Sequence, residues 1–179
     1  NKDLHSGMFG GIARNPIRVL TTILAGLPDA SGRVTLPGFS DGVPELSDGL
    51  RAQWDALGFK PEQFLGEVGL NLPAGEDGKT GLQMIWSEPT LEFNGINGGY
   101  TGAGFKTVLP SQASVKLSAR LVGDQDPHKI RAALHDHVRA NLPDDCTVEF
   151  HPHGASQASV MSTDHPAFEK ARAALSDEW

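Results

Sequence analysis

The chain has 179 residues, 39% of them hydrophobic and 21% charged, so it is long enough to bury a core without disulfides or metals. This balance excludes an intrinsically disordered chain and gives no reason to expect a membrane partner. With 15 basic and 22 acidic residues the formal net charge is −7; no Lys/Arg-rich run is interleaved with aromatic residues, and we expect no nucleic-acid partner.

The first half of the chain shows helical patterns. A glycine-rich turn at 7–11 precedes a helix expected over about 15–27, which Asn15 can cap and in which Pro16 occupies the first turn. Residues 29–80 are rich in Gly, Pro and Asp and are expected to form a partly helical insertion. Apolar residues at helical spacing fall in both segments: Ile17, Leu20, Leu24 and Leu27, then Leu46, Leu50, Trp54 and Leu57.

From Leu82 the periodicity changes from helical to strand-like. Short strands are expected at 84–86 and 90–94, and the glycine-rich residues 95–104 are expected to form a loop. The clearest strand covers 113–122, where apolar and polar residues alternate and Arg120 falls on the polar face.

The C-terminal third is expected to contain two helices and one strand. A helix begins at Asp126 and Pro127 and runs to about Leu142, a strand follows at 148–150, and a last helix begins at Asp164 and Pro166. We expect the apolar stripe of this last helix to pack against sequence beyond this chain. The whole order indicates an α+β two-layer sandwich, an antiparallel sheet with two helices on one face.

Residues of several types are considered for chemistry and set aside. His135 and His137 do not share a helix face, while His151 and His153 lack a third ligand, so we expect solvated or capping histidines and no metal site in this chain. The only cysteine, Cys146, follows two aspartates that disfavour a thiolate. No serine lies in a Gly-x-Ser-x-Gly turn, and the glycine-rich runs match neither a Walker nor a dinucleotide motif.

Two motifs carry a resemblance to a known family. Residues 3–11, Asp-Leu-His-Ser-Gly-Met-Phe-Gly-Gly, resemble the D-L-H-S-G-x-x-G-G signature of M20 metallopeptidases of the carnosinase-like dipeptidase branch. The run from Pro89 through the glycine-rich residues 95–104 and Lys106–Pro110 to Arg120 resembles the lid of the same family. The resemblance covers most of the chain and is loose over 29–80.

This resemblance implies a ferredoxin-like lid and dimerisation domain over residues 1–162, with 29–80 inserted in it, and over 163–179 the start of a return into a catalytic domain. It also implies two zinc ions bound outside this chain, a dipeptide substrate and a homodimer, with the isolated chain inactive. With one cysteine and no apolar signal region at residues 1–5, a cytoplasmic location is expected.

Three side chains receive roles from the resemblance. His5 is expected to donate a hydrogen bond to the oxyanion of the tetrahedral intermediate in the partner subunit's active site. Arg120 is expected to bind the C-terminal carboxylate of the dipeptide through its planar fork, and Thr107 to contact the same substrate across the dimer. Asn94, next to Phe93, is a weaker candidate for the same site.

Two alternatives remain open from the sequence. In the first, the chain is a stand-alone dimerisation or small-ligand-binding module without hydrolytic activity. In the second, it is the lid of another M20 enzyme, either an N-acyl amino acid deacylase or a carboxypeptidase. Metal-binding motifs in the flanking sequence distinguish the peptidase from the module.

Overall fold

The computed structural model describes residues 2–161 and 164–178. Its elements, in chain order, are β1 (Leu4–His5), α1 (Ser6–Phe9), α2 (Pro16–Ala25), α3 (Asp48–Ala56), α4 (Pro61–Gly66), α5 (Gly81–Trp86), β2 (Thr90–Gly98), β3 (Val108–Leu109), β4 (Ala113–Arg120), α6 (Pro127–Ala140) and α7 (Pro166–Glu178). In this described part the strands form two antiparallel pairs, β1 with β3 and β2 with β4.

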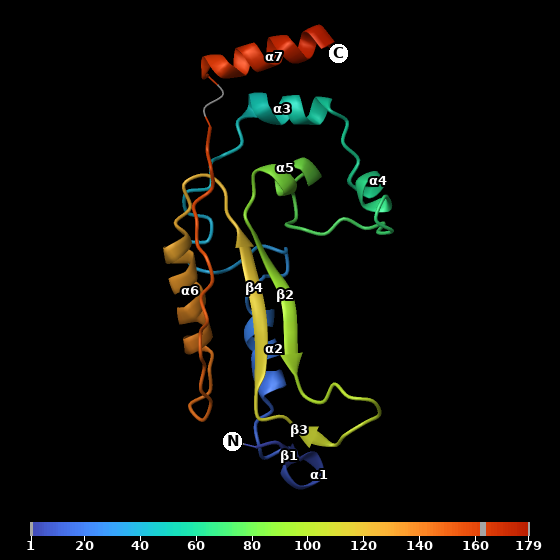
Figure 1. Ribbon diagram of the computed structural model, residues 1–179, viewed down its shortest axis with the longest axis vertical. Coiled ribbons are helices and arrows are strands. Elements are labelled where there is room, and N and C mark those ends of the chain that lie inside the picture. Colours follow the sequence, from blue (N-terminus) through green and yellow to red (C-terminus); the bar gives the residue numbers. More distant parts are fainter. Residues whose placement is uncertain (1, 162–163, 179) are drawn as a thin grey trace.

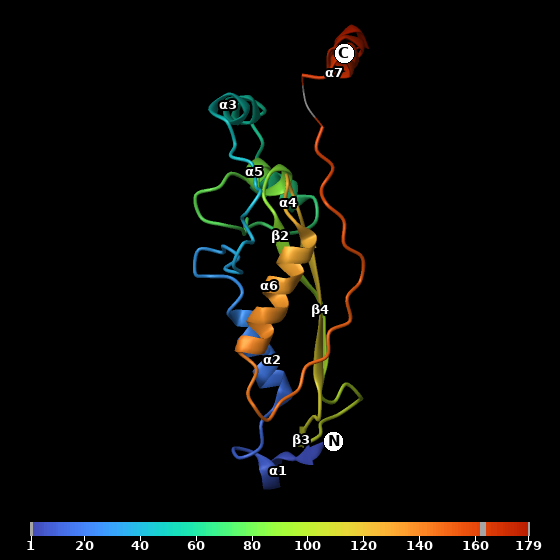
Figure 2. The same cartoon turned by 90° about the vertical axis from the view of Figure 1, so that its left-hand side faces the viewer.

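The expected two-layer α+β arrangement is confirmed. Helices α2 and α6 lie on the same side of the β2–β4 pair, as Figures 1 and 2 show from two directions. Between the layers lies a core of Leu24, Leu27, Leu36, Phe39 and Ile130, against which Val115, Leu117 and Ala119 of β4 pack. Each large apolar side chain buried there contributes about 1.5–3 kcal/mol, so this core fixes the position of β4.

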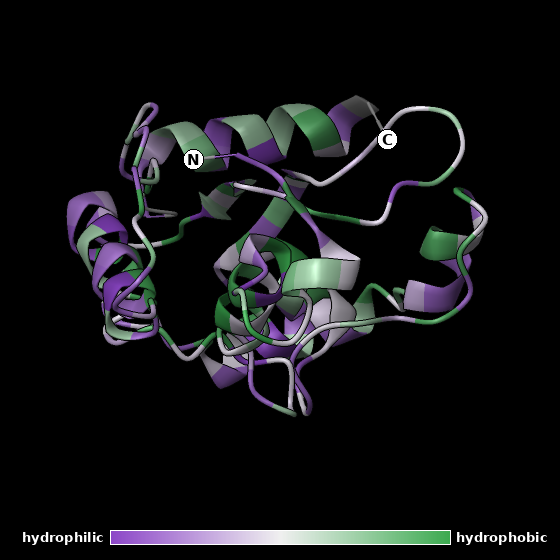
Figure 3. Cartoon of the chain, turned by 90° about the horizontal axis from the view of Figure 1, so that it is seen from below, coloured by the Kyte–Doolittle hydropathy of each residue, from purple (hydrophilic) through white to green (hydrophobic). Residues whose placement is uncertain are grey.

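The ends of α2 and α6 follow the capping residues read from the sequence. Asn15 Oδ1 accepts a hydrogen bond from the Ile17 amide at 2.9 Å, and Asp126 Oδ1 accepts from the amide of His128 at 2.8 Å. The hydrogen bonds from the amides of His128 and Lys129 hold the pKa of Asp126 below its usual value. Coloured by hydropathy, the helices carry both polar and apolar residues around their axes (Figure 3).

Two expectations between residues 84 and 98 are wrong. Residues 84–86 belong to helix α5, which Thr80 caps by accepting from the Gln83 amide at 3.2 Å; a three-residue alternation does not distinguish a strand from a helix. Strand β2 continues to Gly98 through a bulge between Phe93 and Gly95. A Cβ on Gly98 would lie 3.1 Å from Ile17 Cγ1, so glycine here permits the close approach of α2.

The strand expected at 148–150 is also absent from the described residues. This segment has no ladder partner, because β4 pairs only with β2 within residues 2–161 and 164–178. It lies against α6 instead: the Phe150 ring stacks on His135 with centroids 3.8 Å apart, and the Arg139 guanidinium lies 5.1 Å from the centroid of Phe150.

The segment between α2 and β2 contains α3, where Leu50 and Trp54 had predicted a helix, together with α4 and α5. A part-buried polar cluster ties its end together: Lys79 Nζ lies 3.0 Å from Glu76 Oε2 and 2.8 Å from Glu88 Oε2. Burial lowers the pKa of Lys79, but the hydrogen bonds and charges of Glu88 and Glu76 outweigh it and raise the pKa overall.

A buried glutamine that the sequence analysis overlooked joins this segment to the sheet. Gln125 is completely buried, accepts at Oε1 from the Val122 amide at 2.8 Å and donates from Nε2 to the Phe39 carbonyl. A backbone hydrogen bond from Asp124 to the Gly42 carbonyl, 2.9 Å long, lies beside it. These contacts hold the turn after β4 against residues 39–42.

The expected last helix is present as α7, and its side chains Phe168 and Leu175 are 36% and 62% exposed. The domain boundary expected at 162/163 lies outside the described residues. None of the helices in the described part of the chain is both long and apolar enough to cross a bilayer.

Candidate functional site

The pairing of β1 with β3 brings two of the three expected site residues together. Leu4 faces Leu109 and His5 faces Val108 in the ladder, and the Ser6 amide donates to the Thr107 carbonyl at 3.0 Å. Asp3 adds a side-chain tie, since its Oδ1 accepts from the Ser111 amide at 2.8 Å. His5 and Thr107, 102 positions apart in sequence, therefore share one end of the domain.

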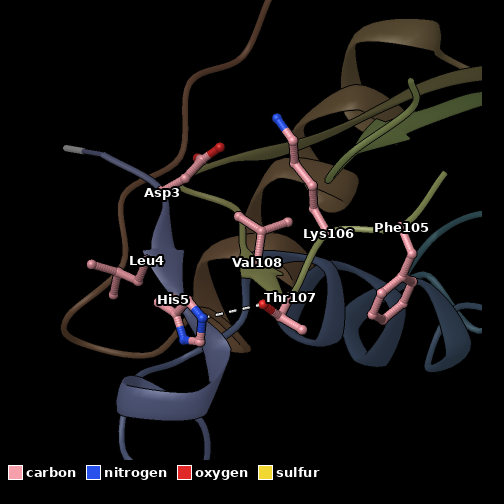
Figure 4. A pocket seen from close by; sticks show the side chains of 7 residues that line it. All are labelled: Asp3, Leu4, His5, Phe105, Lys106, Thr107 and Val108. Carbon is pink, nitrogen blue, oxygen red and sulfur yellow. Dashed lines mark hydrogen bonds between the residues drawn. The ribbon is translucent and has the colours of Figure 1, made fainter. Parts of the chain in front are cut away.

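The local backbone sets the tautomer of His5. Its Nδ1 accepts a hydrogen bond from the Gly7 amide at 3.0 Å, so the neutral imidazole carries its proton on Nε2. His5 Nε2 lies 3.3 Å from Thr107 Oγ1, and in this tautomer it donates to that oxygen (Figure 4). A Cβ on Gly7 would lie 2.9 Å from His5 Cε1, so glycine leaves room for this ring position.

These side chains line an open hollow of about 450 Å³, a volume in the range of small-molecule sites. His5 and Thr107 are both exposed. The lining residues, drawn in Figure 4, are Asp3, Leu4, His5, Phe105, Lys106, Thr107 and Val108. The hollow thus offers an imidazole N–H donor and a hydroxyl, with a lysine and an aromatic ring beside them.

Arg120, the third expected residue, is not at this end. It is the last residue of β4 and is exposed, and its guanidinium makes no ion pair with the acids of the described segments. Strand β4 begins beside β3 and ends toward α5 (Figure 1). Its length of eight residues corresponds to about 23 Å between first and last residue, so one chain does not bring Arg120 to His5.

The other candidates occupy structural positions. Asn94 is the extra residue of the β2 bulge, and its neighbour Phe93 is 43% exposed. His137 Nε2 lies 3.1 Å from the Ile23 carbonyl and joins α6 to α2. Burial, and then the charges of Arg139 and Arg131, lower the pKa of His135. Across 2–161 and 164–178, no three His, Cys, Asp or Glu side chains are grouped as metal ligands.

Asp3, Gly7 and Phe105 help to form the hollow or to position His5 in it, although the sequence analysis predicted no role for these residues. Asp3 and Gly7 belong to the first motif but received no role, although an acid that binds a backbone amide and a glycine two residues after a histidine are both recognisable local signals. Phe105 was missed because nothing in the periodicity marks an exposed aromatic residue in a glycine-rich loop.

Comparison with known proteins agrees with both motifs. The model of the M20 peptidase dimerisation domain matches residues 1–146. The chain belongs to this family. A Cys-Gly metallodipeptidase of Candida albicans is 32% identical over 182 aligned positions, which cover 99% of this chain and 37% of that protein. This M20 dimerisation domain therefore spans a little over a third of that relative's length.

Two solved structures share the fold. Human carnosine dipeptidase 1 superposes with a TM-score of 0.69 at 28% identity, covering 78% of this chain and 30% of that one. An M20 family metallo-carboxypeptidase from Sulfolobus solfataricus gives a TM-score of 0.68 at 33% identity, covering 79% and 37%. The relatives of this dimerisation domain thus include enzymes named for two kinds of peptide hydrolysis.

Proposed function

We propose that this chain is the lid and dimerisation part of a zinc-dependent dipeptidase that acts as a homodimer. The observation that carries the proposal is the His5–Thr107 pair: an imidazole whose Nε2 proton is fixed by Gly7 and faces an open hollow. A neutral N–H donor held in this way suits a developing oxyanion, because its orientation costs little reorganisation at the moment of reaction.

In this proposal Thr107 acts beside His5. While its Oγ1 accepts from His5 Nε2, the hydroxyl proton of Thr107 remains free to donate, so in this arrangement the Thr107 hydroxyl is the free donor of the pair. When the tetrahedral intermediate forms, His5 Nε2–H would exchange Thr107 Oγ1 for the oxyanion while Nδ1 keeps its bond from the Gly7 amide, so the ring would move little. The Thr107 hydroxyl would donate to a neighbouring substrate oxygen.

Arg120 would bind the other end of the dipeptide. Its exposed guanidinium, free of ion pairs with the described acids, can form two parallel hydrogen bonds to a carboxylate. Because β4, about 23 Å long, ends in Arg120 at the end of the domain away from His5, the two groups can meet on one substrate only if each comes from a different protomer. A two-fold dimer supplies this arrangement twice.

The described residues offer no cluster for the metal, and we place the two zinc ions outside this chain, in a catalytic domain into which residues 163–179 would return. When bound there, zinc would supply an activated water. The residues of this chain would bind and orient the substrate and stabilise charge. A reducing cytoplasm suits the free thiol of Cys146.

Hydrolysis by the complete, zinc-loaded protein tests this function. We expect it to cleave dipeptides that carry a free C-terminal carboxylate and to cleave C-terminally amidated analogues at least 10-fold less efficiently. Removal of zinc with a chelator should abolish cleavage, and zinc should restore it. Failure of the zinc-loaded protein to cleave any dipeptide would contradict the proposal and favour a module without hydrolytic activity.

The likeness to the metallo-carboxypeptidase supports a second candidate, removal of the C-terminal residue from longer or N-acylated peptides. Arg120 would bind the terminal carboxylate in either reaction. The same protein should then be given N-acetylated dipeptides and tetrapeptides: efficient cleavage of these would identify a carboxypeptidase, and cleavage only of substrates with a free amino group would identify a dipeptidase.

A further inference from the structure

We infer that Phe105 is a specificity-determining residue, which forms an apolar wall for one side chain of the substrate held by His5 and Thr107. This inference rests on the proposed function and extends it to the class of substrate. Phe105 lines the same hollow as His5 and Thr107 (Figure 4), and it is 87% exposed. An aromatic side chain left in water at a substrate-binding hollow gains free energy when an apolar group covers it.

The loop that carries Phe105 is held by its own contacts. Tyr100 donates from its hydroxyl to the Ala103 carbonyl at 2.8 Å, and Lys106 Nζ lies 4.5 Å from the centroid of the Tyr100 ring. A Cβ on Gly102 would lie 2.5 Å from the Tyr100 hydroxyl oxygen, so glycine lets the loop fold closely onto the tyrosine. Phe105 is thus presented from a folded loop.

The backbone on both sides of Phe105 explains its exposure. Gly104 has φ +82°, a conformation that turns the chain just before the phenylalanine. Two residues later Thr107 is fixed by the hydrogen bond from the Ser6 amide to its carbonyl. Phe105 therefore lies between a turn at Gly104 and the anchored Thr107, and its ring touches little of its own chain.

Lys106 next to it does not give the site a preference for acidic side chains, because its ammonium group is turned to the Tyr100 ring. The remaining apolar lining, Leu4 and Val108, lies on the same hollow. A substrate with a large aliphatic or aromatic side chain would cover Phe105. The ring and the substrate side chain would then both be removed from water. Glycine or alanine at that position would leave the ring exposed.

The test compares Phe105→Ala with Phe105→Leu in the complete zinc-loaded protein. The substrates are Gly-Gly, Ala-Gly, Leu-Gly, Phe-Gly, Gly-Leu and Gly-Phe. For wild type we expect kcat/KM to be higher than for Gly-Gly on at least one of the four substrates that contain leucine or phenylalanine. Phe105→Ala should lower kcat/KM for these substrates roughly 5- to 30-fold and leave Gly-Gly and Ala-Gly within about twofold.

Phe105→Leu should recover most of the lost selectivity, since it restores apolar area without the ring. Equal losses on all six substrates, or no loss on any, would overturn the inference; equal losses together with a weaker dimer in sedimentation would place Phe105 against protein. The activity of the wild-type protein separates the proposed role of Phe105 from the proposed dipeptidase function. Cleavage without selective loss refutes only the role of Phe105, and absence of cleavage refutes the dipeptidase as well.

Discussion

The two ends of β4 carry complementary chemistry. At its start, beside β3, an imidazole N–H and a hydroxyl share a hollow; at its end, toward α5, Arg120 presents a cationic fork to solvent. The first end suits charge that develops during reaction, and the second suits charge that the substrate already has. In the proposed reaction, neither end is a complete site by itself.

The two ends are also built differently. His5 and Thr107 are positioned by backbone hydrogen bonds in a short ladder and by Gly7. Arg120 is positioned by the register of a long strand pair, in which it lies opposite Thr90, above the shared core of α2 and α6. Changes at the two ends should therefore affect different kinetic parameters of the complete enzyme.

The largest effect is expected at the start of β4. His5→Ala in the complete protein should lower kcat on the order of 100- to 1,000-fold, because it removes the imidazole donor of the hollow. KM and zinc content should change little. Steady-state kinetics and metal analysis check this, and unchanged kcat would remove His5 from the reaction.

At the other end, Arg120→Ala should lower kcat/KM roughly 10- to 100-fold for substrates with a free carboxylate, mostly through KM. Arg120→Lys keeps the charge but loses the planar fork, so it should recover only part of the loss. Amidated substrates provide the control: if they suffer the same loss, Arg120 does not bind the carboxylate.

A smaller effect is expected for the hydroxyl beside His5. Thr107→Val keeps the shape and removes the donor, and kcat/KM should fall about 3- to 10-fold. Thr107→Ser keeps the hydroxyl and should stay within about twofold of wild type. If Ser and Val reduce activity equally, the methyl group and not the hydroxyl is what matters at this position.

The smallest effect concerns His135, away from both ends. Its pKa is lowered in the folded chain by burial and by Arg139 and Arg131, so the unfolded chain takes up a proton more readily near the usual value of 6.5. Stability should be complete above that value and decrease as pH falls through it. Urea unfolding at pH 8 and pH 5.5 should show this loss in wild type and a smaller loss in His135→Phe. An equal pH dependence in both proteins would contradict the role of His135.

The sequence predicted the elements whose signals are local and strong. Asn15 with Pro16 and Asp126 with Pro127 mark helix starts that the structure reproduces, and the alternation through Leu117 predicted β4. The errors in secondary structure arise where a strand forms, or does not form, according to contacts with distant parts of the chain. Gly95 is in a strand because β4 offers a ladder, and Phe150 is not in one because within the described residues no strand pairs beside it.

For the candidate site, too, the sequence predicted what depends on local signals and not what depends on tertiary contacts. The motif around His5 identified the residue, but only the ladder to Val108 and the bond from Gly7 show that its Nε2 proton faces Thr107. The separation of Arg120 from this pair depends on the direction of β4 relative to β3, which no local pattern encodes. Hence the sequence could name the groups without showing that one chain keeps them apart.

The most direct measurement mixes two impaired proteins. If each active site takes Arg120 from one protomer and His5 from its partner, then His5→Ala and Arg120→Ala subunits, exchanged at equal concentration, form heterodimers with one intact site and one doubly altered site. Random exchange makes half of the dimers mixed, so activity should rise to about a quarter of wild type. A mixture no more active than the average of the two variants, with subunit exchange verified, would contradict the shared site.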